Sequence, residues 1–257
     1  MAKALNPFAR NQQIEAFLAE RDGNGGTYSA EDIAYLQGYE GSGGQGSRGA
    51  TGEGLLYEFY TPDFVVDLMW EAARAYGYDE AGTVLEPSCA TGRLFRPAPD
   101  YRRCVGFEIN PVSARIAEVS FPGCTVHRGY FETAFLQAPR FTVRPKQPFT
   151  WLAQYPFSLV IGNPPYGIYK NKYAAYFPEG KQGRQIENFF MLMGLRLLKK
   201  DGLLIYLTSS NFLRNADSYR WVKSEMGKLG TFVDAYRLPP VFKSSQVPTD
   251  ILIFRRQ

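Results

Sequence analysis

The stretch Leu159-Val160-Ile161-Gly162-Asn163-Pro164-Pro165-Tyr166 carries the strongest signal in the chain. Its first three residues form an apolar run with the length of a buried strand. The two prolines fix an extended backbone after this run, so that the Asn163 amide and the Pro164 carbonyl are held rigidly beside Tyr166. Two fixed acceptors and an aromatic face suit a planar base with an exocyclic amine. The alternative interpretation is an ordinary proline-rich loop after a strand.

Six further short apolar runs flank this one. They cover residues 83–85, 104–107, 124–127, 203–208, 232–236 and 251–254. Helical patterns over residues 112–119, 186–199 and 216–229 alternate with them, and another helix begins at Thr61-Pro62 and ends near Gly77. On that helix we expect one apolar face made of Phe64, Val65, Leu68, Met69 and Ala72. Strands that alternate with helices predict an α/β fold with a Rossmann-like, doubly wound sheet of seven strands.

The N-terminal residues 1–54 differ from the rest of the chain. Two short helices are expected over residues 11–20 and 29–36, the second with Ser29 and Asp32 in capping-box spacing. Eight of the 17 residues at 38–54 are glycine, which predicts a mobile linker or a loop that awaits a ligand. Residues 41–46 match the dinucleotide fingerprint GxGxxG, but no strand precedes them, so we interpret the match as chance. We therefore expect a helical arm and linker over 1–54 and one catalytic domain over 55–257.

Composition excludes several classes of protein. The apolar content of 45% suffices for a buried core, and the net charge of +4 favours polyanions only mildly. Three widely spaced cysteines and one histidine, His127, argue against a disulfide framework and against a metal site. No apolar segment has the length of a membrane span. These features are typical of a cytoplasmic protein without a membrane association.

Two other strand ends carry unusual residues. The run at 83–85 is followed by Glu86-Pro87-Ser88-Cys89-Ala90-Thr91-Gly92, a turn of small residues that lets a cofactor approach the backbone. The run at 104–107 is followed by Glu108, 22 positions after Glu86, where a doubly wound site uses a carboxylate to hold ribose hydroxyls. Alone, the first is an ordinary strand-to-helix turn and the second a solvated acid.

Together these strings resemble the S-adenosylmethionine-dependent DNA adenine-N6 methyltransferases. The resemblance runs from Tyr57 to the C-terminus: Tyr60-Thr61-Pro62 comes first, then the turn at Glu86, Glu108 and Asn163-Pro164-Pro165-Tyr166, an order similar to that of the gamma class. Residues 202–213 and 241–254 also resemble later strands of this family. YLQGYEG at 35–41 and EFYTP at 58–62 resemble methylase segments of phage and plasmid methylase-helicase proteins.

The resemblance implies a site for S-adenosylmethionine. Its expected contacts are Tyr60, Thr61, Glu86, Ser88, Ala90 and Gly92 around the amino-acid part, Glu108 on the ribose, and Ile109, Tyr130 and Phe131 around the adenine. Two departures bear on this site. Ala90 replaces a glycine of the family, and the third motif offers Tyr130 and Phe131 where relatives often have Asp. We therefore expect stacking in place of a hydrogen bond, and weaker cofactor binding.

The resemblance also implies methylation of an adenine flipped out of DNA, as in restriction-modification systems. Asn163, Pro164, Pro165 and Tyr166 are then the catalytic residues, with Tyr166 on one face of the base and Phe242 on the other. For Phe242 a core position is the alternative. The stretch 167–185 has the charge of a phosphate-contacting lid, through Lys170, Lys172 and Arg184, unless it is a plain solvated loop.

Other functions remain open from the sequence. Glutamine methylases of release factors and guanine methylases of ribosomal RNA share the Asn-Pro-Pro-Tyr string, and a non-catalytic subunit that binds DNA or cofactor is a third interpretation. Cytosine-C5 methylation is disfavoured because no Pro-Cys pair supplies a thiol nucleophile. Residues beyond the last predicted strand leave no room for a recognition domain, so we expect a partner subunit or a neighbouring domain to supply sequence specificity.

Overall fold

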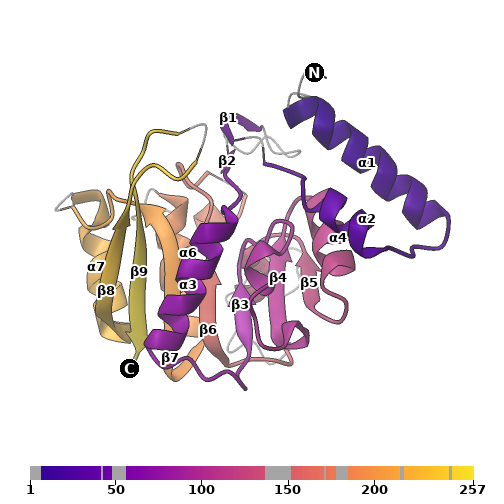
Figure 1. The fold of residues 1–257 in the computed structure, drawn as a ribbon. Helices are drawn as coiled ribbons and strands as arrows, with labels where there is room; N and C mark the ends of the chain where they lie inside the picture. The colour runs from indigo at the N-terminus through magenta and orange to yellow at the C-terminus, as the bar shows by residue number, and fades with distance from the viewer. Residues whose placement is uncertain are drawn as a thin grey trace.

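The computed structural model describes residues 7–41, 43–47, 56–136, 152–170, 172–177, 185–214, 217–242 and 245–257. Its centre is a seven-stranded sheet (Figure 1) with the order β5-β4-β3-β6-β7-β9-β8. The strands are β3 Val84–Glu86, β4 Cys104–Glu108, β5 Thr125–Arg128, β6 Phe157–Gly162, β7 Leu198–Ser209, β8 Gly230–Leu238 and β9 Thr249–Arg256. All seven predicted runs are strands of this sheet, which confirms the predicted fold class.

One strand runs against the others. β9 is antiparallel to both of its neighbours, β7 and β8, while the remaining pairs are parallel. The sheet is therefore mixed, with β9 reversed relative to its neighbours. Strand direction was not readable from the run at 251–254, because an apolar run has the same composition in either direction.

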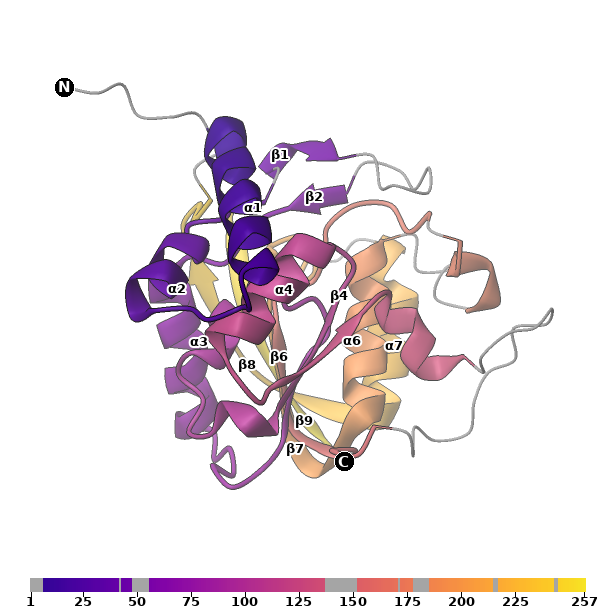
Figure 2. The same ribbon diagram turned by 90° about the vertical axis from the view of Figure 1, so that its right-hand side faces the viewer.

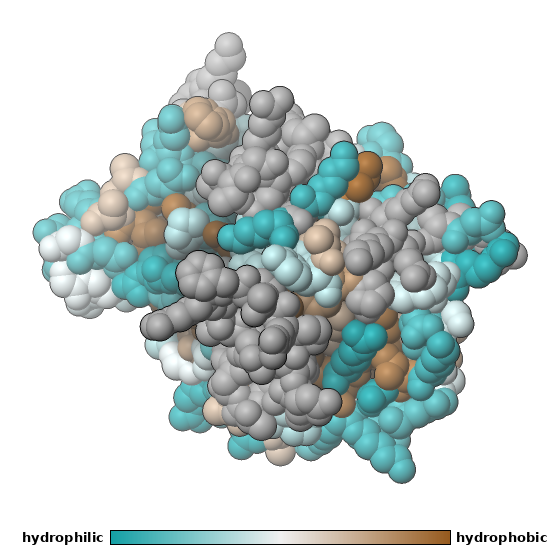
Figure 3. Space-filling view, turned by 180° about the vertical axis from the view of Figure 1, so that it is seen from behind, coloured by the Kyte–Doolittle hydropathy of each residue, from teal (hydrophilic) through white to brown (hydrophobic). Residues whose placement is uncertain are grey.

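Helices cover both faces of the sheet. In Figure 2, α3 (Asp63–Ala75) lies on one face, and α6 (Ile186–Leu197) and α7 (Asp217–Leu229) lie on the other. α6 is buried at every position except Arg196 because it lies between the sheet and α7. Among the side chains that are coloured in the view from behind, hydrophilic ones lie around the edge and hydrophobic ones lie between them (Figure 3). The apolar residues of the predicted strands thus form two cores, one under each helix layer.

The apolar face of α3 differs from the prediction. Val65, Met69 and Ala72 are buried as expected, but Phe64 is 55% exposed and Leu68 is 40% exposed. The stripe that packs on the sheet is completed by Val66, Trp70 and Ala73. The helix is rotated relative to the expectation because Trp70 is fully buried and donates its indole N–H to the Leu94 carbonyl at 2.8 Å. The large aromatic residue therefore decided which face points inward.

The N-terminal arm contains both predicted helices. They are α1 (Pro7–Gly23) and α2 (Ala30–Leu36), and Ser29 and Asp32 form the expected capping box. The arm packs against α4 (Pro111–Ser120) through a small core of Ile14, Leu18, Leu36, Tyr39, Ile116 and Val119. It is therefore anchored on the same helix that follows Glu108 (Figure 1).

The glycine-rich tract contains a strand where a linker was expected. β1 (Gly43–Ser47) pairs antiparallel with β2 (Leu56–Glu58). For these five residues the prediction of a mobile linker is wrong. The hydrogen bonds between β1 and β2 join backbone groups, which glycine also has, so a glycine-rich segment can form a strand. Gly43 and Gly46 of the GxGxxG match lie in this strand, so the match opens no helix. The domain boundary at residue 54 lies outside the described residues and stays a prediction.

In the described part of the chain, no helix combines the length and the apolar character that crossing a membrane requires.

Candidate active site

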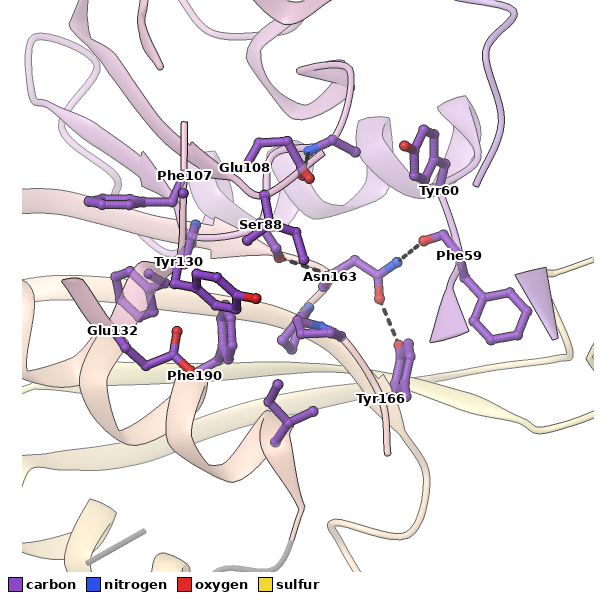
Figure 4. Close-up of a pocket in the computed structure, with 18 of the residues that line it drawn as sticks. Phe59, Tyr60, Ser88, Phe107, Glu108, Tyr130, Glu132, Asn163, Tyr166 and Phe190 are labelled. Atoms are coloured by element: carbon purple, nitrogen blue, oxygen red, sulfur yellow. Dashed lines mark hydrogen bonds between the residues drawn. The ribbon is translucent and has the colours of Figure 1, made fainter. Parts of the chain in front are cut away.

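A cleft lies where β3, β4, β5 and β6 end, and we call it the acidic cleft after Glu108 and Glu132 on its wall (Figure 4). A small cavity that includes Glu86 and Thr61 adjoins it. The predicted site residues that line the cleft itself are Tyr60, Ser88, Ala90, Glu108, Ile109, Tyr130, Phe131, Asn163, Pro164, Pro165, Tyr166 and Lys170. Parallel strands bring their carboxyl ends to one edge, which is why segments distant in the sequence meet here.

Asn163 stands at the centre of this arrangement. Its Nδ2 donates to the Phe59 carbonyl at 2.6 Å, and its Oδ1 accepts from the Tyr166 hydroxyl at 2.7 Å. Because a carbonyl only accepts, the bond to Phe59 fixes which end of the carboxamide is the oxygen. The Ser88 hydroxyl also donates to the backbone carbonyl of Asn163 at 3.2 Å. The carboxamide oxygen is therefore directed toward Tyr166, and both residues line the cleft.

Glu108 holds two backbone segments in place. Its Oε2 accepts from the Ala90 N–H at 2.8 Å, and its Oε1 accepts from the Asn110 N–H at 2.7 Å. Ala90 has a φ of 46°, in the left-handed region where family members carry glycine. The turn after β3 is thus formed despite the Cβ of Ala90. The structure places Gly92 at the end of this turn, with a φ of 77°, where it begins a 3-10 helix.

Glu86 is a buried acid with an unused acceptor. It is 4% exposed, and its Oε2 has no hydrogen-bond partner among the described residues. Burial, with a smaller contribution from the Glu108 carboxylate, raises the pKa of Glu86 well above its usual value. Glu86 lines the small adjoining cavity. A cationic group bound there would give the Glu86 Oε2 the hydrogen-bond partner that it lacks among the described residues.

A second cavity begins on the other side of Tyr166, and we call it the aromatic cavity because Phe59, Tyr166 and Phe242 line it. The Phe59 ring lies 4.9 Å from Phe242 and 6.2 Å from Tyr166, measured between centroids. Phe242 is 8% exposed and packs in the core under α3 while it lines this cavity. Phe242 therefore occupies a core position at the edge of a cavity, and its contact with a base stays a prediction.

Three residues of these cavities were missed in the sequence. Phe59 supplies both the carbonyl that orients Asn163 and a ring of the aromatic cavity. Glu132 is 1% exposed, lines the acidic cleft and accepts from the Tyr169 hydroxyl at 2.9 Å. It directly follows Phe131, one residue beyond the string for which stacking was expected in place of a hydrogen bond, and that expectation stays a prediction. Glu187, at the start of α6, lines the aromatic cavity. The sequence offered only proximity as a signal: Phe59 directly precedes Tyr60, Glu132 directly follows Phe131, and Glu187 lies two residues after the stretch 167–185.

The three predicted phosphate contacts fare differently. Lys170 is exposed and lines the acidic cleft. The Lys172 ammonium lies 5.1 Å from the centroid of the Tyr130 ring, at the same side of the cleft. Arg184 lies outside the described residues.

Comparison with known proteins finds similarity to proteins of restriction-modification systems. The family described as "Eco57I restriction-modification methylase" matches residues 103–238. "Defense against restriction protein B" of Escherichia phage P1 is 27% identical over 91% of this chain and 9% of its own length. "Type II methyltransferase M.TthHB8I" of Thermus thermophilus is 27% identical over 76% of this chain and 44% of its own length. The chain thus spans less than half the length of either curated relative.

Solved structures share the fold. A class I S-adenosylmethionine-dependent methyltransferase from Listeria monocytogenes has a TM-score of 0.58 at 19% identity, over 77% of this chain and 61% of its own. A modification subunit of a type I restriction enzyme from Vibrio vulnificus has a TM-score of 0.62 at 19% identity, over 90% of this chain and 50% of its own. The seven-stranded sheet is therefore that of the class I methyltransferases.

Proposed function

The chain belongs to the Eco57I restriction-modification methylase family, and we propose that it transfers a methyl group from S-adenosylmethionine to the N6 amine of an adenine flipped out of DNA. The observation that carries this proposal is the fixed orientation of the Asn163 carboxamide, whose Nδ2 is held by Phe59. Its oxygen accepts from the hydroxyl of Tyr166, a residue that lines both the acidic cleft and the aromatic cavity.

The side chains of the acidic cleft fit the cofactor. S-adenosylmethionine, when bound, supplies an electrophilic methyl group on a sulfonium. Glu86, with its unpartnered buried oxygen, suits the cationic amino-acid part, and the Glu108 carboxylate suits ribose hydroxyls as an acceptor. Ile109, Tyr130 and Phe131 offer apolar surface for the adenine ring.

The catalytic role of Asn163 follows from the chemistry of the amine. The lone pair of an adenine amine is delocalised into the ring, so transfer is faster in a site that favours a pyramidal nitrogen. Asn163 Oδ1 and the Pro164 carbonyl accept one amine hydrogen each. Acceptors that are positioned before the reaction cost no reorganisation during it. The rigid proline backbone and the bond from Asn163 to Phe59 provide that positioning.

The aromatic cavity suits the extruded base. An amine inside a duplex is out of reach of a cleft at a sheet edge, so the base has to leave the stack. The rings of Phe59, Tyr166 and Phe242 offer apolar faces to it. Lys170, which is exposed and lines the acidic cleft, suits a phosphate of the DNA. A partner subunit or neighbouring domain supplies the sequence specificity in this proposal.

The test is to incubate unmethylated genomic DNA with labelled S-adenosylmethionine and to identify the modified nucleosides by mass. N6-methyldeoxyadenosine is the expected product, absent with the Asn163→Ala variant. A different methylated nucleoside would refute the adenine assignment. Tight binding of S-adenosylmethionine in calorimetry without any methylated nucleoside would instead favour a non-catalytic subunit.

A further inference from the structure

Glu187 is a buried acid on the wall of the aromatic cavity. It is 3% exposed and lies in the first turn of α6. The Tyr219 hydroxyl of α7 donates to its Oε1 at 3.3 Å, but its Oε2 has no hydrogen-bond partner among the described residues. Thr249 lines the same cavity, and its buried Oγ1 is likewise without a partner in the described ranges. Buried polar atoms are rarely left unsatisfied, so this wall is built to meet polar atoms of a ligand.

We propose that Glu187 is a positioning residue for the target base, and that its protonated carboxyl donates a hydrogen bond to a ring nitrogen of the extruded adenine. The inference rests on the proposed function, since it concerns the base that Asn163 receives. It concerns the ring nitrogens of the base, whereas Asn163 and Pro164 contact the reacting amine.

The chemistry of adenine explains why the acid has to be protonated. The amine is the only hydrogen-bond donor on the exposed edges of adenine, and in the proposed site its hydrogens point to Asn163 and Pro164. The ring nitrogens that remain are acceptors. An ionised carboxylate also only accepts and would repel them, whereas a neutral carboxyl group has an O–H to donate.

The surroundings of Glu187 favour the neutral form. Burial raises the pKa of Glu187 to about 7, although its own and the Gly167 backbone amides and the Tyr219 hydroxyl favour the carboxylate. Burial also raises the pKa of Tyr219 to about 12 and that of Tyr166 still further, so both phenols stay protonated at neutral pH.

Charged groups on the elements next to Glu187 have partners other than Glu187. On α7, the Lys223 ammonium donates to the Arg214 carbonyl at 2.9 Å. On β9, Asp250 forms an ion pair with Arg237. Among the described residues, Glu187 is therefore the group of this cavity that titrates near neutral pH.

The experiment compares Glu187→Gln and Glu187→Ala with the wild type and with Asp217→Asn, a control at an exposed ion pair on α7. Initial rates of methyl transfer to unmethylated genomic DNA are measured from pH 6 to pH 9 with saturating S-adenosylmethionine. The wild-type rate is expected to fall as the pH rises through about 7, because the donor proton is lost. Gln keeps an N–H donor that does not titrate, so this fall should disappear while the rate at pH 6.5 stays within about threefold of the wild type.

Glu187→Ala removes the donor at every pH. We expect the KM for DNA to rise by about tenfold at pH 6.5, the size of one lost hydrogen bond, with an unchanged Kd for S-adenosylmethionine. Thermal unfolding of each variant separates this effect from loss of folded protein. Parallel pH profiles for the wild type and Glu187→Gln, or a Gln variant as impaired as Ala, would overturn the role of Glu187. A wild type that forms no methylated nucleoside would instead overturn the proposed function and this inference together.

Discussion

The acidic cleft and the aromatic cavity share Phe59 and Tyr166 but differ in their chemistry. The acidic cleft and its adjoining cavity carry three acids: Glu86 and Glu108 end β3 and β4, and Glu132 lies in the 3-10 helix after β5. The aromatic cavity carries four rings, Phe59, Tyr166, Tyr219 and Phe242, and one acid, Glu187, whose pKa is raised to about 7. Carboxyl oxygens accept hydrogen bonds from ammonium and hydroxyl groups, and flat rings suit a base. The same edge of the sheet therefore offers one surface with acids and another with aromatic rings, and Tyr166 lines both.

Asn163 marks the border between the two sides. Its carboxamide contacts Phe59 and Tyr166, the two residues that both sides share. Substitutions on one side should therefore change the binding of one ligand, whereas a change at Asn163 should affect the reaction between them.

The largest effect is expected from Asn163→Ala. Loss of one preorganised polar partner typically lowers a rate by about a hundredfold to a thousandfold, so methyl transfer should fall below detection. Affinity for S-adenosylmethionine should change by less than about twofold, since the acids of the cleft are untouched. Labelled methyl transfer and calorimetry measure the two quantities. A variant with half of the wild-type rate would contradict a catalytic role of Asn163.

A smaller effect is expected on the acidic side from Glu108→Gln. The amide keeps one acceptor but loses the charge that holds the Ala90 and Asn110 N–H groups, so the Kd for S-adenosylmethionine should rise by about tenfold. The KM for DNA should stay unchanged. Glu118→Gln is the matched control, because Glu118 pairs with Arg115 and Arg128 near the surface. Equal effects of the two variants would mean that Glu108 acts only through net charge.

On the aromatic side, Phe242→Leu should act on DNA alone. Leucine retains most of the apolar volume but removes the ring, and stacking of a base on an aromatic side chain is worth about 1–3 kcal/mol. The KM for DNA should rise by about fivefold with an unchanged Kd for S-adenosylmethionine. Phe64→Leu, at an exposed position of α3, serves as the control. A rise in the Kd for S-adenosylmethionine would show that the two sides are not separate.

The smallest effect is expected from Ala90→Gly. Glycine adopts a φ of 46° without the steric cost that alanine pays, so the free energy of unfolding should increase by about 0.5–1 kcal/mol. Ala72→Gly, inside α3, should lower it by about 1 kcal/mol. Chemical denaturation of both variants gives the comparison. Destabilisation by Ala90→Gly would show that the Cβ of Ala90 contributes packing that outweighs its backbone strain.

The strands and helices that the sequence predicted correctly are those that depend on a local pattern of residues. Each apolar run of the sheet was visible because burial on both faces of a strand selects apolar residues along its length. The helix that follows Pro62 was visible from its proline and its periodicity, but its inward face was not. The burial of Trp70 fixed that face, and it depends on the Leu94 carbonyl, which lies in another segment.

The site also contains residues that the sequence identified and residues that only folding brings together. The Asn163 string and Glu108 were recognisable because their chemistry is local: prolines fix a backbone, and an acid ends a strand. Phe59 was not recognisable as a partner of Asn163, since the two are 104 residues apart and meet only through folding. Glu132 and Glu187 were ordinary acids in the sequence, and only burial distinguishes them.

The sequence alone thus determined the elements of the sheet and the groups that meet at its carboxyl edge, because strand formation and proline geometry depend on neighbouring residues. The tertiary structure decided the direction of β9, the orientation of the Asn163 carboxamide and the raised pKa of Glu187. Each of these depends on contacts between distant segments and on exclusion of water, which no short stretch of residues specifies.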